Sequence, residues 1–160
     1  DVEETGKDFE ENAILKAKNA FTKTNISSVG DDSGLIVPAI NDEPGLYSAR
    51  YAGLNATDSD NRNKLISKLK DKKLESTYAY FFCCIVAVGI KDQNEVIVCD
   101  GKVEGEVRTI ERGEKGFGYD PMFYPKGYSE SFAELSSLEK NRISHRGQAL
   151  KKLMDKLNKT

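Results

Sequence analysis

The chain has 160 residues, of which 38% are hydrophobic and 31% charged, and its formal net charge is −2. This length predicts one domain with a substantial core, and no apolar run is long enough to form a membrane-spanning helix. Cys83, Cys84 and Cys99 make a poor disulfide framework and have no histidine at zinc-ligand spacing. We therefore expect a reduced, cytoplasmic compartment and no membrane partner.

The first predicted element is a helix over Phe9 to Lys23. Its apolar residues recur at helical spacing: Ala13, Ile14, Ala17, Ala20 and Phe21. Asp8, followed three residues later by Glu11, resembles a capping box. Glu11 lies at the edge of the apolar stripe, where its carboxylate can either cap the helix or bind a metal ion.

The stretch from Gly30 to Leu35 places two adjacent carboxylates, Asp31 and Asp32, and the Ser33 hydroxyl between two short apolar runs. We predict a strand, a tight acidic turn and a second strand here. Carboxylates suit Mg²⁺, which takes one or two protein ligands and completes its shell with water and phosphate oxygens. Asp, Ser and Gly are also common turn formers, so this stretch by itself favours a solvated turn.

The middle of the chain predicts a helix followed by a meander of strands. Leu46 to Gly53 shows no clean period, and a helix capped by Thr57 or Asp58 then runs to about Lys72. The strands that follow are predicted at Tyr78 to Ile90, Glu95 to Cys99 and Lys102 to Glu111. Cys83 and Cys84 are neighbours on a strand, so their side chains should point to opposite faces. This order of elements indicates a single domain of the α/β or α+β class with a mixed sheet.

The stretch from Arg112 to Pro121 is rich in glycine and aromatic residues. Its glycines allow close backbone approach, Phe117 and Tyr119 supply ring faces, and Asp120 supplies a carboxylate. Aromatic rings of this kind can stack on nucleobases. The same pattern fits an ordinary loop whose rings return to the core, and both interpretations stay open at this point.

Ser144 is predicted to cap the last helix, whose apolar face consists of Ala149, Leu150, Leu153, Met154 and Leu157. His145 and Arg146 then lie in the first turn, where positive charge opposes the helix dipole. An anionic or carbonyl ligand that meets these donors would explain the arrangement. The remaining basic residues from Lys140 onward lie largely opposite the apolar face, as on any solvated helix, so no nucleic-acid partner is expected.

Together these stretches resemble the inosine triphosphate pyrophosphatase family, which hydrolyses non-standard purine nucleoside triphosphates. The resemblance rests on five separated motifs in order. They are Glu3-Glu4-Thr5-Gly6 with Phe9 to Ala13, Asp31 to Leu35, Pro44 to Gly53, Gly116 to Pro121, and Lys140 with Ser144 to Gly147. It implies an α/β domain over residues 1–160 with a central twisted mixed β-sheet flanked by helices, and an active-site cleft between two lobes.

The resemblance also implies roles for single residues. Asp32 would be the catalytic base and a Mg²⁺ ligand, and Glu11 the second metal ligand. The substrate-binding residues would be Ser33, Phe117, Gly118, Tyr119, Asp120, Lys140, His145 and Arg146. Asp31 would be structural support. The substrates would be ITP, dITP and XTP, hydrolysed to the monophosphate and pyrophosphate, and the assembly a homodimer.

One departure from the family pattern leaves alternatives open. A complete member opens with a strand and a Ser-Gly-Asn phosphate loop, and this chain starts about thirty residues later; we therefore expect the domain to be N-terminally incomplete. A protein that truly lacked the loop could bind nucleotides without hydrolysing them. A pyrophosphatase of the Maf family is a further alternative, whose motifs differ from these, and a cysteine hydrolase built on Cys83 or Cys84 is disfavoured because an apolar strand opposes the thiolate.

Overall fold

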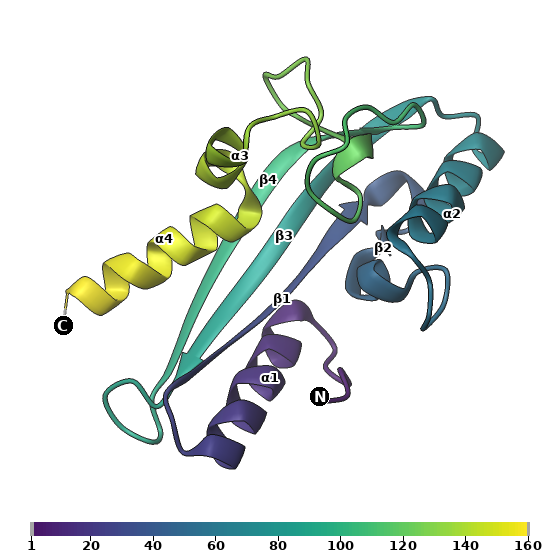
Figure 1. Cartoon of the computed structure of the whole chain (residues 1–160). Helices are drawn as coiled ribbons and strands as arrows, with labels where there is room; N and C mark the ends of the chain where they lie inside the picture. The colour runs from purple at the N-terminus through teal and green to yellow at the C-terminus, as the bar shows by residue number, and fades with distance from the viewer. Residues whose placement is uncertain (1, 160) are drawn as a thin grey trace. The chain divides into compact units, whose positions relative to one another are not determined.

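The computed structural model describes residues 2–159. The helices are α1 (Phe9–Thr24), α2 (Asp58–Asp71), α3 (Ser137–Ile143) and α4 (His145–Asn158), with short 3-10 turns at Pro38–Ile40, Gly45–Arg50 and Asp120–Met122. The strands are β1 (Ser28–Val37), β2 (Glu43–Pro44), β3 (Ser76–Val88), β4 (Val96–Arg108) and β5 (Phe123–Pro125). They form one open sheet in the order β2-β1-β3-β4-β5, flanked by helices, as the sequence predicts for an α/β fold (Figure 1).

The chain divides into two compact units, which we describe separately. Unit 1 comprises residues 2–33, 82–102 and 145–159, and unit 2 comprises residues 34–81 and 103–144. Strands β1, β3 and β4 each contribute residues to both units. Within residues 2–159, no helix has the length and apolar character needed to cross a membrane.

In unit 1 the sheet carries a helix on each face. Alternate residues of β3, beginning at Cys83, pack with Ala149 and Leu153 of α4, whereas those beginning at Cys84 pack with Ala13 and Ala17 of α1. The two cysteines therefore face opposite sides of the strand, as predicted. In Figure 1, α1 and α4 lie on either side of the strands.

The core of unit 2 forms between α2 and the other halves of the strands. Leu65 and Leu69 of α2 are fully buried, together with Phe123 of β5 and Phe132. The rings of Phe123 and Phe132 lie 4.9 Å apart between centroids. This apolar packing fixes α2 beside the loop that follows β4.

Two predicted breaks in the strands are wrong. The acidic stretch is no turn, because β1 runs without interruption from Ser28 to Val37. Neither Gly30 nor Gly34 adopts a positive φ angle, and a Cβ at Gly30 would lie 2.6 Å from the Ala13 carbonyl oxygen and from Ala17 N. Gly30 therefore serves close packing against α1 instead of chain reversal.

The second wrong break lies in β4, where two predicted strands are one. Gly101 again marks a close approach, since a Cβ there would lie 2.0 Å from the His145 carbonyl oxygen. The predicted helices α1, α2 and α4 are confirmed within one or two residues at their ends. The predicted apolar face of α4 is only half buried, because Leu150 and Met154 are 45% and 55% exposed.

Candidate active site

Asp32 is a buried carboxylate on β1, and its partners come from α1. Asn12 Nδ2 donates a hydrogen bond to Asp32 Oδ2 at 3.2 Å, and Lys16 Nζ donates one to Oδ1, also at 3.2 Å. The Asp32 side chain is 8% exposed. Because side chains alternate along a strand, Asp32 points toward α1 while its neighbours point away.

Lys16 connects Asp32 to the N-terminal segment. Its ammonium group lies 2.6 Å from Glu4 Oε1 and also donates to the carbonyl oxygen of Asp31 at 2.9 Å. Burial by itself lowers the pKa of Lys16, but the hydrogen bond to Glu4 and the charge of Asp32 outweigh it, so the pKa is raised. The cation is thus held between two carboxylates.

The sequence alone assigned no role in the site to Glu4, Asn12 or Lys16. Asn12 and Lys16 are four residues apart on α1, next to the buried Ala13 and Ala17. Polar residues at helical spacing beside an apolar stripe are a signal that could have indicated a buried polar partner. The sequence by itself does not identify that partner as Asp32.

Burial raises the pKa of the Asp32 carboxyl above its ordinary value, and the charge of Lys16 and the hydrogen bond from Asn12 oppose this shift only in part. A carboxylate with a raised pKa is a better proton acceptor near neutral pH than an exposed one. This property suits a general base.

Asp31 and Ser33 lie on the other side of β1 and contact α4. Arg146 Nη2 donates to Asp31 Oδ2 at 2.9 Å and lies 3.3 Å from Ser33 Oγ. His145, which precedes Arg146 in the first turn of α4, is 9% exposed. The ion pair with Asp31 compensates the positive charge that Arg146 brings to the helix start. Asp31 supports the position of Arg146, in line with a structural role.

Glu11 makes a different set of contacts from Asp32. Its Oε2 accepts a hydrogen bond from Lys7 N at 2.7 Å, and its backbone N–H donates to the Asp8 side chain at 2.8 Å. The predicted cap of α1 by Asp8 is confirmed. These contacts place the Glu11 carboxylate at the first turn of α1, where its negative charge interacts favourably with the helix dipole.

In unit 2, five predicted residues form an aromatic-loop group: Phe117, Gly118, Tyr119, Asp120 and Lys140. The Lys140 ammonium group forms an ion pair with Asp120 and lies 4.8 Å from the centroid of the Phe117 ring. Asp120 Oδ2 also accepts from Phe117 N at 3.0 Å. The group therefore combines a cation, a buried carboxylate and an aromatic face.

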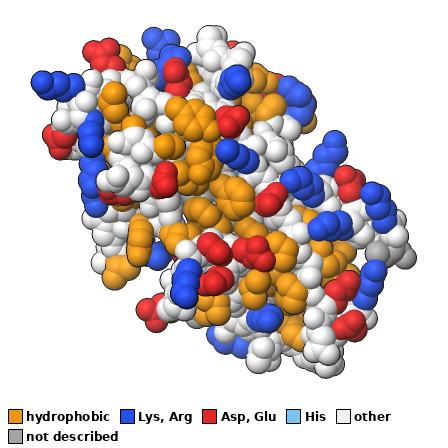
Figure 2. All heavy atoms as spheres, turned by 180° about the vertical axis from the view of Figure 1, so that it is seen from behind, with side chains coloured by type: hydrophobic (Ala, Val, Ile, Leu, Met, Phe, Trp, Pro, Cys, Tyr) orange, Lys and Arg blue, Asp and Glu red, His pale blue; other side chains and the backbone are white. Residues whose placement is uncertain are grey.

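The two rings of this group have different surroundings. Tyr119 is 4% exposed and its hydroxyl donates to the carbonyl oxygen of Ser48 at 2.7 Å. Ser48 Oγ in turn accepts from Leu35 N at 3.0 Å. The segment from Leu46 to Gly53, for which the sequence predicts no regular element, therefore anchors the loop. Phe117 is 60% exposed, which leaves its ring available for contact with a ligand. Figure 2 shows one face of the molecule, on which hydrophobic side chains reach the surface among charged ones.

The predicted site residues thus fall into two groups. Asp32, Ser33, His145 and Arg146 belong to unit 1, with Glu11 at the start of α1, and the aromatic-loop group belongs to unit 2. Among residues 2–159 there is no cluster of three or more His, Cys, Asp or Glu side chains that could hold a metal ion. Mg²⁺ needs only one or two protein carboxylates when phosphate oxygens and water complete its shell, so the carboxylates of unit 1 fit this metal.

The cysteines have the properties of core residues. Cys83, Cys84 and Cys99 are free and buried, and burial raises the thiol pKa of Cys83 to about 11 and that of Cys84 to about 12. A thiol with such a pKa is a poor nucleophile at neutral pH. This agrees with the sequence-based argument against a cysteine hydrolase.

The fold and these side chains define an open-sheet α/β protein with a buried, cation-paired carboxylate on its first strand. The profile of the Ham1 family matches residues 1–156, and the chain belongs to this family. The dITP/XTP pyrophosphatase of Idiomarina loihiensis is 48% identical over 159 residues, which are 99% of this chain and 79% of the relative. The dITP/XTP pyrophosphatase of Bacillus anthracis is 46% identical over 157 residues, 98% of this chain and 78% of the relative.

Solved structures of the family have the same fold. A HAM1 protein from Coxiella burnetii superposes with a TM-score of 0.93 at 43% identity, covering 100% of this chain and 81% of the other. The Ham1 protein of Staphylococcus aureus gives a TM-score of 0.89 at 46% identity, with 99% and 80% coverage.

Proposed function

We propose that the protein hydrolyses the non-standard purine nucleoside triphosphates ITP, dITP and XTP to the monophosphate and pyrophosphate, and so removes them from the nucleotide pool. The observation that carries this proposal is the buried Asp32 carboxylate with Lys16 on one side and Glu4 beyond it. Relatives named dITP/XTP pyrophosphatase, 46–48% identical over nearly the whole chain, support the substrate class.

Asp32 is the proposed general base. Its raised pKa supports the acceptance of a proton from the water that attacks the α-phosphorus. Lys16 keeps the carboxylate oriented and offsets its charge. Pyrophosphate is the leaving group, and a bound metal ion would supply neutralisation of its negative charge.

For the metal ion we propose Mg²⁺, bound by Asp32 and one further carboxylate. A bound Mg²⁺ supplies charge neutralisation and orientation of the triphosphate. Glu11 is the second ligand that family resemblance implies. Glu4 is the alternative, because it already shares Lys16 with Asp32.

We propose that the aromatic-loop group holds the purine base, with Phe117 stacked on the ring. Its exposed ring and the nearby Lys140 ammonium group support this role. His145 and Arg146 are proposed as donors to the 6-oxo edge, which hypoxanthine and xanthine share and where adenine carries an amine. Ser33, next to Arg146, is proposed to contact the nucleotide. A homodimer in the cytoplasm completes the proposal; the three free cysteines support a reducing compartment.

The decisive experiment is a substrate panel with pyrophosphate detection in the presence of Mg²⁺. ITP, dITP and XTP should be converted to monophosphates far faster than ATP and GTP, and Asp32→Asn should abolish most of this rate. Equal rates on all five nucleotides would exclude the proposed specificity. Binding of ITP without release of pyrophosphate would instead identify a nucleotide-binding protein.

A further inference from the structure

The first residues of α2 contact the middle of the aromatic loop in unit 2, which comprises residues 112–121. Asp58 Oδ2 accepts a hydrogen bond from Gly118 N at 2.8 Å, and Arg62 Nη1 donates one to the Gly118 carbonyl oxygen at 2.8 Å. The two side chains are four residues apart and therefore share one face of the helix. Together they bind both polar backbone groups of a single residue.

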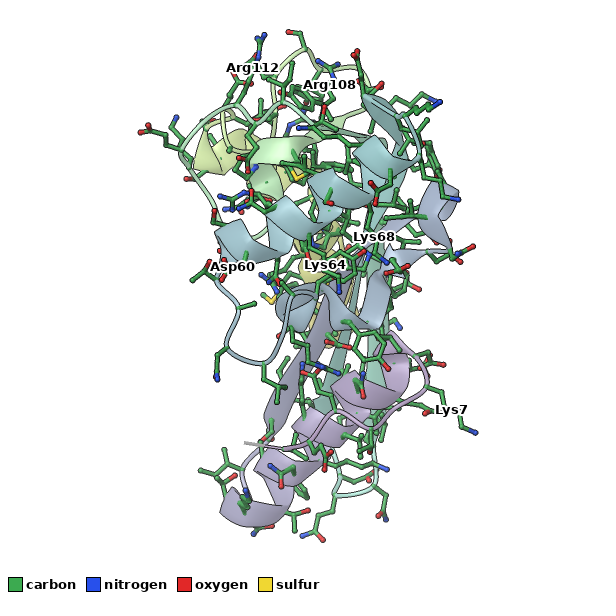
Figure 3. All side chains as sticks on the ribbon, turned by 90° about the vertical axis from the view of Figure 1, so that its right-hand side faces the viewer. Lys7, Asp60, Lys64, Lys68, Arg108 and Arg112 are labelled. Atoms are coloured by element: carbon green, nitrogen blue, oxygen red, sulfur yellow. The ribbon has the colours of Figure 1, made fainter. Side chains whose placement is uncertain are left out.

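These contacts are separate from the capping of α2. The cap is provided by Thr57 and Asp60, whose side chains and backbone N–H groups form a capping box. Asp58 is therefore not needed for the cap. Asp60, Lys64 and Lys68 mark the course of α2 in Figure 3.

Arg62 is itself held in place. Its Nε forms an ion pair with Glu111, which lies just before the loop, and the Arg62 side chain is only 18% exposed. One guanidinium group thus joins α2 to the beginning of the loop and to its centre. The planar guanidinium group of arginine holds its donors at fixed angles, whereas the ammonium group of a lysine would be flexible.

Gly118 lies between the two aromatic residues of the loop, Phe117 and Tyr119. Gly118 has a φ angle of +60°, which favours glycine, although a Cβ there would meet none of the described atoms within 4 Å. The Phe117 ring is largely exposed, and the Lys140 ammonium group lies 4.8 Å from its centroid. Its position depends on the backbone on both sides, through Asp120 and through Gly118.

We propose that Asp58 and Arg62 are positioning residues for the purine base: they hold Gly118 and thereby set the place of the Phe117 ring. This inference rests on the proposed function, because it takes the aromatic loop as the base-holding segment. The two side chains act through the loop and leave the reacting phosphates untouched.

The test compares Asp58→Ala and Arg62→Ala with Asp60→Ala, a control that removes a neighbouring carboxylate from the same helix turn. Asp58→Ala should raise KM for ITP about tenfold with kcat nearly unchanged, the effect of losing one hydrogen bond to a charged group. Arg62→Ala, which also loses the ion pair with Glu111, should raise KM at least as much. Asp58→Asn, which keeps an acceptor oxygen, should recover most of the wild-type KM. Asp60→Ala should lower the melting temperature and leave KM unchanged.

Hydrogen exchange of the loop gives a second measurement that needs no catalysis. The Gly118 amide should exchange faster in Asp58→Ala than in Asp60→Ala. Wild-type KM in both Asp58→Ala and Arg62→Ala, or equal exchange in Asp58→Ala and Asp60→Ala, would overturn the proposal. Failure of the wild type to hydrolyse ITP would reject the proposed function. Hydrogen exchange at Gly118 and the affinity for ITP would still test the role of Asp58 and Arg62.

Discussion

Asp32 shows how strongly the surroundings of one residue change its chemistry. On β1 its carboxylate is almost fully buried, and burial raises its pKa even though Lys16 and Asn12 contact it. Because the folded state keeps the Asp32 proton to a higher pH than the unfolded chain does, ionisation of Asp32 costs stability. If Asp32 acts as the proposed base, this loss of stability is a common compromise in enzymes.

Asp32→Asn should therefore lose activity and gain relative stability. Asn cannot ionise, whereas wild-type Asp32 contributes stability that is complete below its unfolded pKa and lost as pH rises through the raised folded pKa. The melting temperature of Asp32→Asn minus that of the wild type should grow as the pH rises from below 3.8, the ordinary pKa of this carboxyl, through the raised pKa of the folded state. Thermal unfolding across this range measures it, with the exposed Asp100→Asn as the charge control. A difference that shrinks with pH would mean that the ion pair outweighs burial.

The two candidate metal carboxylates can be separated by substitution. Glu11→Gln keeps an oxygen that can accept from Lys7 N and leaves the Asp8 cap intact, so activity should change little if Glu4 is the metal ligand. Glu4→Gln keeps an acceptor oxygen but removes the negative charge beside Lys16, and in that case should lower kcat/KM by about tenfold or more. Steady-state kinetics over a Mg²⁺ titration measures both. A larger loss in Glu11→Gln would identify Glu11 as the ligand.

At the scale of elements, two glycines explain why the predicted strand breaks are wrong. Gly30 and Gly101 look like strand breakers, but both lie inside long strands. Each is required where a helix approaches the sheet, which is a property of tertiary packing that no local pattern contains. The helices were predicted well because their caps and apolar spacing are local.

Gly101→Ala should disturb the start of α4. The added Cβ would lie 2.0 Å from the carbonyl oxygen of His145, a backbone atom that cannot move aside easily. We expect a loss of about 1–3 kcal/mol in the free energy of unfolding, typical of overpacking, and a lower kcat/KM through displacement of His145 and Arg146. Urea unfolding measures the first effect.

The neighbouring Asp100→Ala is the matched control for this substitution. It removes only an exposed ion pair with Lys152 and should cost less than about 1 kcal/mol. Equal stability losses in the two variants would contradict the close-approach argument for Gly101.

At the scale of the whole molecule, the chain carries a natural probe in each unit. All seven tyrosines lie in unit 2, and all three cysteines lie in unit 1. Because β1, β3 and β4 pass through both units, we expect the units to unfold together. Tyrosine fluorescence and thiol alkylation should give the same urea midpoint. Cysteines that react well below the tyrosine midpoint would show that unit 1 opens alone.

The sequence by itself determined the local features and the family. Cap residues, helical periods and the opposite faces of Cys83 and Cys84 follow from neighbours in the chain, and ordered motifs over its whole length indicated the family that the comparisons confirm. These features depend on short sequence separations or on many residues at once. Neither requires knowledge of which distant side chains meet.

Only the tertiary structure decided which groups surround each carboxylate. Asp31 and Asp32 are adjacent in sequence, yet one binds Arg146 from α4 and the other Lys16 from α1. The pleat of β1 sends them to opposite faces of the sheet, where helices more than a hundred residues apart in sequence supply the partners. Burial and partner charge set the pKa of Asp32, and both arise from packing that the acidic motif does not encode.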